Sequence, residues 1–140
     1  MLFFPFVPAR SGGRARPSLI EMIQLERVVD AVCDAEAVVC VDATAELRAV
    51  AEHARAVEPW LRDMAAGRGV DAVALRRAAP RAFERDTIVL LRQGLAHAED
   101  LRVVAEDDGD AGLAAFCTSW IARRRPLVDA VDHALSVTHS

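Results

Sequence analysis

The stretch TAELRAVAEHARAVEPWLRDMAA, residues 44–66, has the pattern of an amphipathic α-helix. Its apolar residues recur at alternating steps of three and four, and they are Leu47, Val50, Ala54, Val57, Leu61 and Met64. Charged residues fill many of the positions between them, so one face of the helix is apolar and the other suits water. The apolar face needs a cover, and the stretch therefore predicts a bundle of similar helices.

Three other segments of the chain repeat this helical spacing. They are residues 19–41, with Ser18 as N-cap; residues 80–107, starting at Pro80 or Phe83; and residues 111–135, with Asp110 as N-cap. Residues 70–82 suit a short connector that Asp71 caps and Pro80 breaks. We therefore predict an all-α, up-and-down four-helix bundle with a short extra connector helix between helices 2 and 3.

The boundary between the first two helices has no glycine or proline to mark it. Asp42 and Thr44 favour a turn at residues 41–44, whereas the apolar phase also runs on through Ala43. An unbroken helix would have about 45 residues, far more than is usual, so we predict two helices.

Glycines and prolines mark the other breaks. Pro59 should kink or restart the second helix, and Gly67 and Gly69 should end it. Gly94 costs the third helix about 1 kcal/mol relative to alanine, which predicts a close helix crossing at that point. Gly109 should end this helix, and Pro126 should bend the last one.

Composition restricts the classes of function. The chain has 140 residues and a formal net charge of −4, and all of its fixed cations are arginines. Excess negative charge disfavours nucleic acid as the main partner. No segment is long and apolar enough to span a membrane, and no phosphate-binding loop or dinucleotide fingerprint is present. Cys33, Cys40 and Cys117 lack metal-site spacing, so we expect them to pack as small hydrophobic residues in a reducing cytoplasm.

The first 18 residues, MLFFPFVPARSGGRARPS, differ in composition from the rest. Their arginines follow the apolar run instead of preceding it, unlike a secretory signal. We expect a disordered extension, or upstream sequence from a mis-assigned start with Met22 as the natural one, ahead of a single bundle domain at 19–140. The alternative is a membrane-surface or partner-binding tag built on Phe3, Phe4 and Phe6.

Four polar residues share the phase of the apolar faces: Glu36, His53, His97 and Arg124. They could meet inside the bundle as a polar cluster. The expected arrangement is a structural ion pair of Glu36 with Arg124, with both histidines at the rim of the core. The alternative is a metal or redox site built on Glu36, His53 and His97, although an inward arginine repels a bound cation.

The helix order resembles that of the ferritin-like superfamily of four-helix bundles. The stretch AEHARAVEPWLRDM, residues 51–64, is similar to that family, and residues 109–135 resemble the final hairpin of its small bacterial, stress-associated members. The resemblance implies a di-iron site with a carboxylate from each of two helices and Glu-x-x-His on the other two. Glu36 could supply one carboxylate.

The remaining ligands of such a site are missing. Val50 stands three residues before His53, Arg102 three after Glu99, and Ala130 three before His133. The resemblance therefore implies a degenerate metal site, without oxidase or iron-storage activity.

We accordingly expect a non-enzymatic cytoplasmic protein, without catalytic residues, cofactor or metal, that acts as a structural or interaction module with possible links to stress. Its partner would be a second copy or another protein. One alternative is a metal-binding or redox bundle that uses the polar residues of the core. The other is a partner subunit or sensor domain that exposes Trp60 and the N-terminal phenylalanines at an interface.

Overall fold

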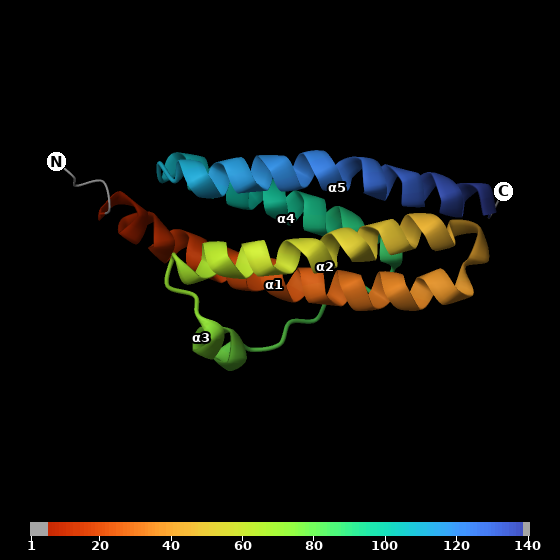
Figure 1. Ribbon diagram of the computed structural model, residues 1–140, viewed down its shortest axis with the longest axis horizontal. Coiled ribbons are helices and arrows are strands. Elements are labelled where there is room, and N and C mark those ends of the chain that lie inside the picture. The colour runs from red at the N-terminus through yellow and green to blue at the C-terminus, as the bar shows by residue number, and fades with distance from the viewer. Residues whose placement is uncertain (1–5, 139–140) are drawn as a thin grey trace.

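The computed structural model describes the backbone of residues 6–138 and the side chains of residues 14–137. Four long helices form the bundle, and within the described range there are no strands (Figure 1). They are α1 (Phe6–Val39), α2 (Thr44–Ala66), α4 (Thr87–Asp107) and α5 (Ala111–Thr138). A 3-10 turn, η1 (Val41–Ala43), joins α1 to α2, and the short helix α3 (Ala72–Arg77) lies between α2 and α4. The all-α four-helix bundle with a connector helix is confirmed. The predicted up-and-down order was wrong, because the long connector between α2 and α4 returns the chain to the end of the bundle where α2 began (Figure 1).

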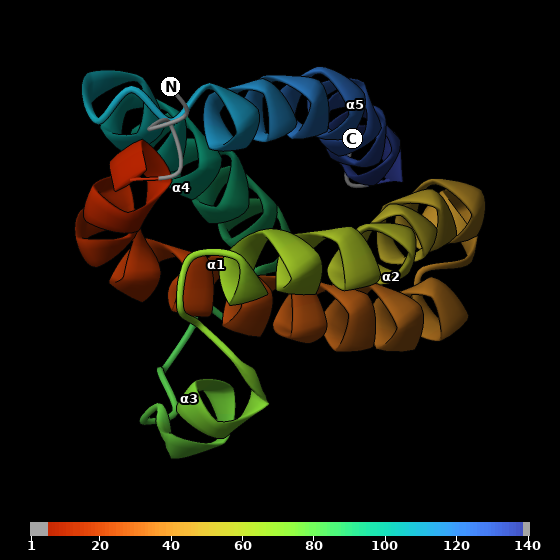
Figure 2. The ribbon, with the colours of Figure 1, turned by 60° about the vertical axis from the view of Figure 1, so that its left-hand side comes forward.

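The bundle consists of two hairpins, α1–α2 and α4–α5, packed against each other (Figures 1 and 2). Neighbouring helices are antiparallel: Arg14, early in α1, pairs with Asp108, just after α4, and Arg68, just after α2, bonds to Asp110, just before α5. The connector, residues 67–86, carries the chain back along the bundle, so that α2 and α4 run in the same direction. None of the described helices is apolar over enough of its length to cross a membrane.

The apolar core has two halves. One surrounds Leu19, Leu61, Leu101 and Leu113, and the other surrounds Val29, Leu47, Leu90 and Val131. All eight side chains are fully buried. The two halves leave room between them for the polar cluster described below.

Helix α1 begins earlier than predicted, at Phe6 instead of Leu19. Ala15 is buried with 1% of its surface exposed, and Arg14 forms an ion pair with Asp108 at 2.8 Å, so this part of the chain packs on the bundle. The predicted N-cap at Ser18 was wrong because α1 continues through Pro17 and Ser18. Packing of Ala15 against the core offsets the backbone hydrogen bond that a proline removes.

Phe3 and Phe4 of the predicted N-terminal tag lie outside the described residues, and the side chain of Phe6 is likewise not described. Met22, the expected natural start, is buried in the core.

The break between α1 and α2 is confirmed at residues 40–43. Thr44 stabilises this turn without acting as a helix cap. Its hydroxyl donates a hydrogen bond to the carbonyl oxygen of Ala37, in the preceding helix, at 2.7 Å. Helix α2 then continues through Pro59 to Ala66 without a restart. The hairpin is therefore closed by a side chain that bonds back to the preceding helix.

Helix α4 begins at Thr87, later than the predicted start at Pro80 or Phe83. Asp86 caps it, accepting a hydrogen bond from the backbone nitrogen of Val89 at 3.1 Å. Its end at Asp107 is as predicted. The apolar spacing predicted too long a helix because spacing alone does not identify the N-cap, which is Asp86.

Two glycines have the roles expected of them. A Cβ atom on Gly94 would lie 3.2 Å from the side chain of Leu25, so α1 and α4 cross closely at this point. Gly109 has a φ of +74°, which glycine adopts without strain, and it ends α4. Asp110 follows and caps α5, accepting from the backbone nitrogen of Leu113 at 3.2 Å.

Candidate functional site

The centre of the bundle holds a buried ion pair between Arg124 of α5 and Glu26 of α1. Their side chains are 0% and 1% exposed. Arg124 donates from Nη1 to Oε1 of Glu26 at 3.0 Å and from Nη2 to Oε2 at 2.7 Å. This is the bidentate geometry in which an arginine–carboxylate pair is strongest.

Two aromatic side chains complete the group. Arg124 Nε donates to Nδ1 of His53 at 2.9 Å, and Trp120 donates from Nε1 to Oε2 of Glu26 at 3.0 Å. The guanidinium carbon lies 4.4 Å from the centroid of the Trp120 ring, a cation–π contact. We call these four residues, Glu26, His53, Trp120 and Arg124, the Arg124 cluster.

The spacing of the residues explains how the cluster forms. Trp120 and Arg124 are four residues apart on α5, so the guanidinium can lie over the indole ring. Glu26 shares the inward face of α1 with the buried Ile23 and Val29. The cluster therefore joins the side chains of α1, α2 and α5 across the middle of the bundle.

Hydrogen bonding fixes the tautomer of His53. Arginine can only donate, so Nδ1 must be unprotonated and Nε2 must carry the ring hydrogen. Burial, together with the charges of Arg124 and Arg123, lowers the pKa of His53 to about 4. The imidazole is therefore neutral at pH 7 and acts as an acceptor on one side and a donor on the other.

The structure brings together two of the four polar residues singled out in the sequence. Arg124 lies inside as predicted, and His53 contacts it. The prediction that Glu36 pairs with Arg124 was wrong. Glu36 is half-buried and accepts a hydrogen bond from Cys40 Sγ at 3.2 Å. His97 lies at the rim of the core, 2.8 Å from the carbonyl oxygen of Ser18.

Glu26 is the residue that sequence reasoning missed. A signal was present, because Glu26 lies seven residues after Leu19 and seven before Cys33, two buried positions of α1. A charged residue in phase with a buried stripe should itself have been treated as buried and in need of a partner.

Burial protects the thiols of Cys33 and Cys117 from reaction. Burial raises the pKa of Cys33 to about 12 and that of Cys117 to about 12. The hydrogen bond to Glu36, followed by desolvation, raises the pKa of Cys40. All three cysteines are free thiols. Cys33 and Cys117 pack in the core as small hydrophobic residues.

Glu26 and His53 are of the ligand types that bundle proteins use for metals. Here both bind the guanidinium of Arg124, which occupies the cationic position at the centre of the bundle. Within the described part of the chain, no three His, Cys, Asp or Glu side chains are grouped as metal ligands would be.

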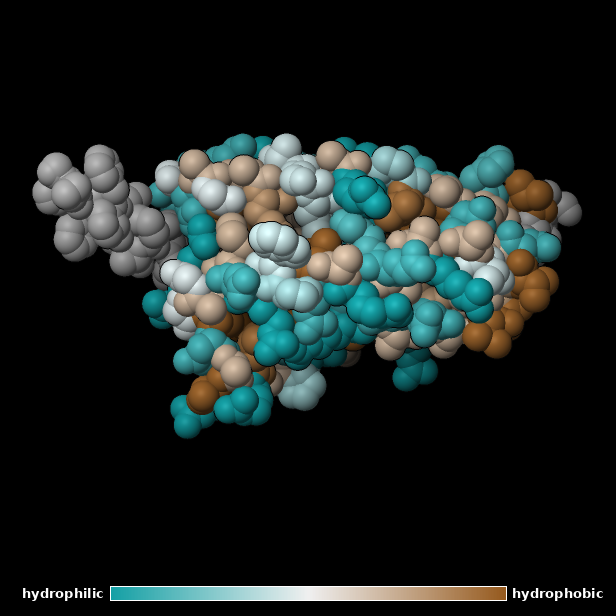
Figure 3. Space-filling view, in the orientation of Figure 1, coloured by the Kyte–Doolittle hydropathy of each residue, from teal (hydrophilic) through white to brown (hydrophobic). Residues whose placement is uncertain are grey.

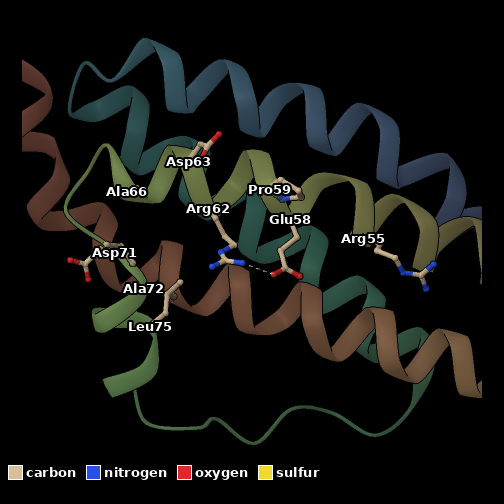
Figure 4. Close-up of a pocket in the computed structure, with 10 residues that line it drawn as sticks. Arg55, Glu58, Pro59, Arg62, Asp63, Ala66, Asp71, Ala72 and Leu75 are labelled. Carbon is tan, nitrogen blue, oxygen red and sulfur yellow. Dashed lines mark ion pairs between the residues drawn. The ribbon is translucent and has the colours of Figure 1, made fainter.

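A hollow of about 600 Å³ lies between α2 and α3 (Figure 4). Both of its arginines are paired: Arg62 lies 3.8 Å from Glu58, the contact dashed in Figure 4, and Arg55 lies 2.7 Å from Asp30 of α1. The pairing leaves these arginines with little capacity to attract an anionic ligand.

A second hollow, of about 370 Å³, lies between α2 and α5 beside the Arg124 cluster. His53 and Trp60 line it from α2, and Phe116, Trp120 and Arg123 from α5. We call it the α2/α5 groove. It combines aromatic walls with an imidazole and a guanidinium.

The end of the molecule that holds the α1–α2 turn is apolar on its surface. Val38, Val39 and Val41 are 72%, 75% and 76% exposed. Figure 3 shows brown, hydrophobic surface at this end. Val137 of α5 is 60% exposed, and the end of α5 lies at the same end of the bundle (Figure 1). We call these four valines the valine end.

Comparison of the chain with protein-family models, curated proteins and solved structures gave no match. The features of the molecule that bear on its function are the Arg124 cluster, the α2/α5 groove and the valine end.

Proposed function

We propose that the protein is a non-enzymatic helical module that acts by association, in the first place with a second copy of itself through the valine end. The observation that carries this proposal is the exposure of Val38, Val39 and Val41, each about three-quarters accessible to solvent. Adjacent exposed apolar side chains of this kind mark interaction surfaces in soluble proteins.

A second copy suits this surface because a twofold axis brings the same patch of both molecules together. Valine against valine buries apolar area on both molecules. Four valines provide less than the roughly 800 Å² per partner of a standard interface. We therefore expect a weak dimer, with a dissociation constant on the order of micromolar or above.

The interior supports a structural role. The charges of Glu26 and Arg124 bind each other, and the buried thiols are held in their protonated form. Groups of this kind hold helices together and are poorly placed to react with a substrate. We therefore expect the protein to act through contacts made by its surface.

We further propose ferritin-like kinship for the bundle, with Arg124 in place of metal, and a cytoplasmic location in a bacterium. The kinship rests on the single long crossover between α2 and α4, the connection that ferritin-like bundles share. Three free thiols support a reducing compartment.

Light scattering coupled to size-exclusion chromatography tests the association over a range of protein concentrations. The wild type should show a molar mass that rises with concentration toward twice that of the chain. The double variant Val39→Asp/Val41→Asp should remain monomeric because two carboxylates would face two others across the axis.

Val103→Asp is the matched control, since Val103 is 46% exposed on α4, away from the valine end. It should associate as the wild type does. A wild type that stays monomeric at millimolar concentration, or equal effects of the control and the double variant, would refute the proposal.

A further inference from the structure

The α2/α5 groove has the features of a small-molecule site. Its volume of about 370 Å³ lies in the range of ligand pockets. Figures 1 and 2 show α2 and α5 diverging toward the end of α2. The groove is lined on α2 by residues from His53 to Trp60. Trp60 lies 16 residues into α2 from Thr44, about 24 Å along the helix axis from the valine end. The groove is therefore a separate surface from the proposed dimer interface.

Aromatic side chains line the groove. Trp60 is 69% exposed, an unusual exposure for a side chain that gains so much from burial. Phe116 and Trp120 face it from α5. Trp120 is held rigidly because its indole nitrogen bonds to Glu26 and its ring packs on Arg124. A flat apolar group placed in the groove would bury the exposed face of Trp60 against an already ordered wall.

His53 supplies a hydrogen-bond donor of fixed direction. Its Nδ1 is engaged by Arg124, so the Nε2 hydrogen is on the opposite side of the ring. Among the described residues none accepts a hydrogen bond from Nε2, and the His53 ring forms part of the groove wall. The pKa of about 4 keeps this donor neutral and in one tautomer at pH 7.

Arg123 supplies a positive charge at the same place. It lines the groove, and its charge contributes to lowering the pKa of His53, so the two groups are close. No carboxylate in the described part of the chain lies within ion-pair distance of Arg123, whereas its neighbour Arg125 lies 3.6 Å from Glu99. The groove thus presents an unpaired cation next to a fixed donor, which complements a carboxylate.

From this juxtaposition we propose that the α2/α5 groove binds a small planar aromatic carboxylate. The aromatic ring lies against Trp60 and Phe116. The carboxylate accepts a hydrogen bond from Nε2 of His53 and pairs with the guanidinium of Arg123. No bond is made or broken, and the Arg124 cluster acts only by holding His53 and Trp120 in place.

The chain contains two tryptophans, and both line this groove, so their two indole N–H signals in a proton–nitrogen NMR spectrum report on it directly. We would titrate the full-length protein with 2-naphthoate and, separately, with the neutral 2-naphthamide. The acid should shift the Trp60 signal with a dissociation constant of about 1 mM or below. The amide should bind about fivefold more weakly because it cannot pair with Arg123.

Two variants locate the charge. Arg123→Gln should weaken binding of 2-naphthoate about fivefold and leave the amide unaffected. Arg125→Gln is the matched control and should bind both compounds as the wild type does. Raising the salt concentration to 0.5 M should weaken binding of the acid alone, because it screens the pair with Arg123.

Three results would overturn the proposal. They are the absence of any shift in the indole signals at 5 mM 2-naphthoate, equal affinities for the acid and the amide, and equal effects of Arg123→Gln and Arg125→Gln. Substitution of exposed arginines is not expected to unfold the protein, and unchanged indole signals of the free variants will verify this.

Discussion

Among the described residues, two inward arginine–carboxylate pairs differ in what surrounds them. Arg124–Glu26 lies in the middle of the bundle, with side chains 0% and 1% exposed. Arg68–Asp110 lies at one end, with side chains 12% and 5% exposed. Both are bidentate, since Arg68 donates from Nε and Nη2 to the two carboxylate oxygens at 2.6 and 2.7 Å.

The remaining hydrogen bonds separate the two pairs. Around Arg124 and Glu26 they go to the side chains of His53 and Trp120. Around the end pair they go to the backbone: Arg68 donates to the carbonyl oxygen of Met64, and Asp110 caps α5. The central pair thus depends on other side chains. The end pair instead bonds to backbone groups at helix termini, which water could otherwise hydrogen-bond. The loss of one partner should be far more harmful at the centre.

The largest expected effect is that of Arg124→Met. It leaves the carboxylate of Glu26 buried without its counter-charge, and the free energy of unfolding should fall by about 3–5 kcal/mol. Urea denaturation followed by circular dichroism measures the change. Glu26→Gln, which strands the arginine, should have a similar effect. A loss below about 1 kcal/mol in both variants would show that water reaches the pair.

Arg68→Met should have a smaller effect. Solvent at the end of the bundle can hydrate Asp110, whose role as a cap does not need the arginine, so we expect a loss of about 1–2 kcal/mol. The same denaturation experiment applies. Arg55→Gln, which removes an exposed ion pair with Asp30, serves as control and should leave the unfolding midpoint unchanged. A loss at Arg68 equal to that at Arg124 would remove the distinction between centre and end.

Acid should weaken the centre through His53. Its pKa is about 4 in the folded protein and about 6.5 in the unfolded chain, so the unfolded state binds the additional proton between these values. The contribution to stability is complete above pH 6.5 and declines as the pH falls toward 4. His53→Gln keeps an acceptor for Arg124 and cannot be charged. After allowance for the half-exposed ring, the wild type should lose about 1 kcal/mol more than this variant between pH 7 and pH 4.

Parallel loss of stability in the wild type and His53→Gln over this pH range would mean that His53 does not titrate as described. Carboxylates titrate in both proteins, so the comparison isolates the imidazole.

The smallest effect concerns reactivity. Cys40 is half-buried, whereas Cys33 and Cys117 are completely buried with pKa values near 12. An aromatic disulfide reagent should therefore label Cys40 first in the folded protein, and the other two only on unfolding. Mass spectrometry of digested protein identifies the site. Early labelling of Cys117 would indicate that the half of the core near Arg68 opens more readily than the centre.

Much of the fold follows from local patterns. Apolar spacing predicted the four long helices, and Gly67, Gly109 and Asp110 predicted where some of them end or begin. The start of α1 was wrong because proline at residue 17 was taken as a boundary, while the burial of Ala15 depends on contacts with other helices. The direction of α4 also depends on the path of the connector, which has no sequence pattern of its own.

The candidate site was predictable in part. Arg124 was placed inside because it shares the phase of the apolar face of its helix, and His53, singled out on the same ground, lines the groove. Glu26 was missed because its partner lies 98 residues away along the chain. A charge in an apolar stripe signals burial, but only the packing of α1 against α5 identifies the residue that neutralises it.

Our central claim is that the chief role of Glu26 and Arg124 is to neutralise each other's buried charge. The unfolding free energy of the double variant Glu26→Leu/Arg124→Met tests it most directly. Replacing both charges with apolar side chains removes the stranded partner and leaves unpaired only Nδ1 of His53 and the indole N–H of Trp120. We predict that the double variant recovers at least half of the stability that Arg124→Met loses. A double variant as unstable as Arg124→Met, or less stable, would contradict the account.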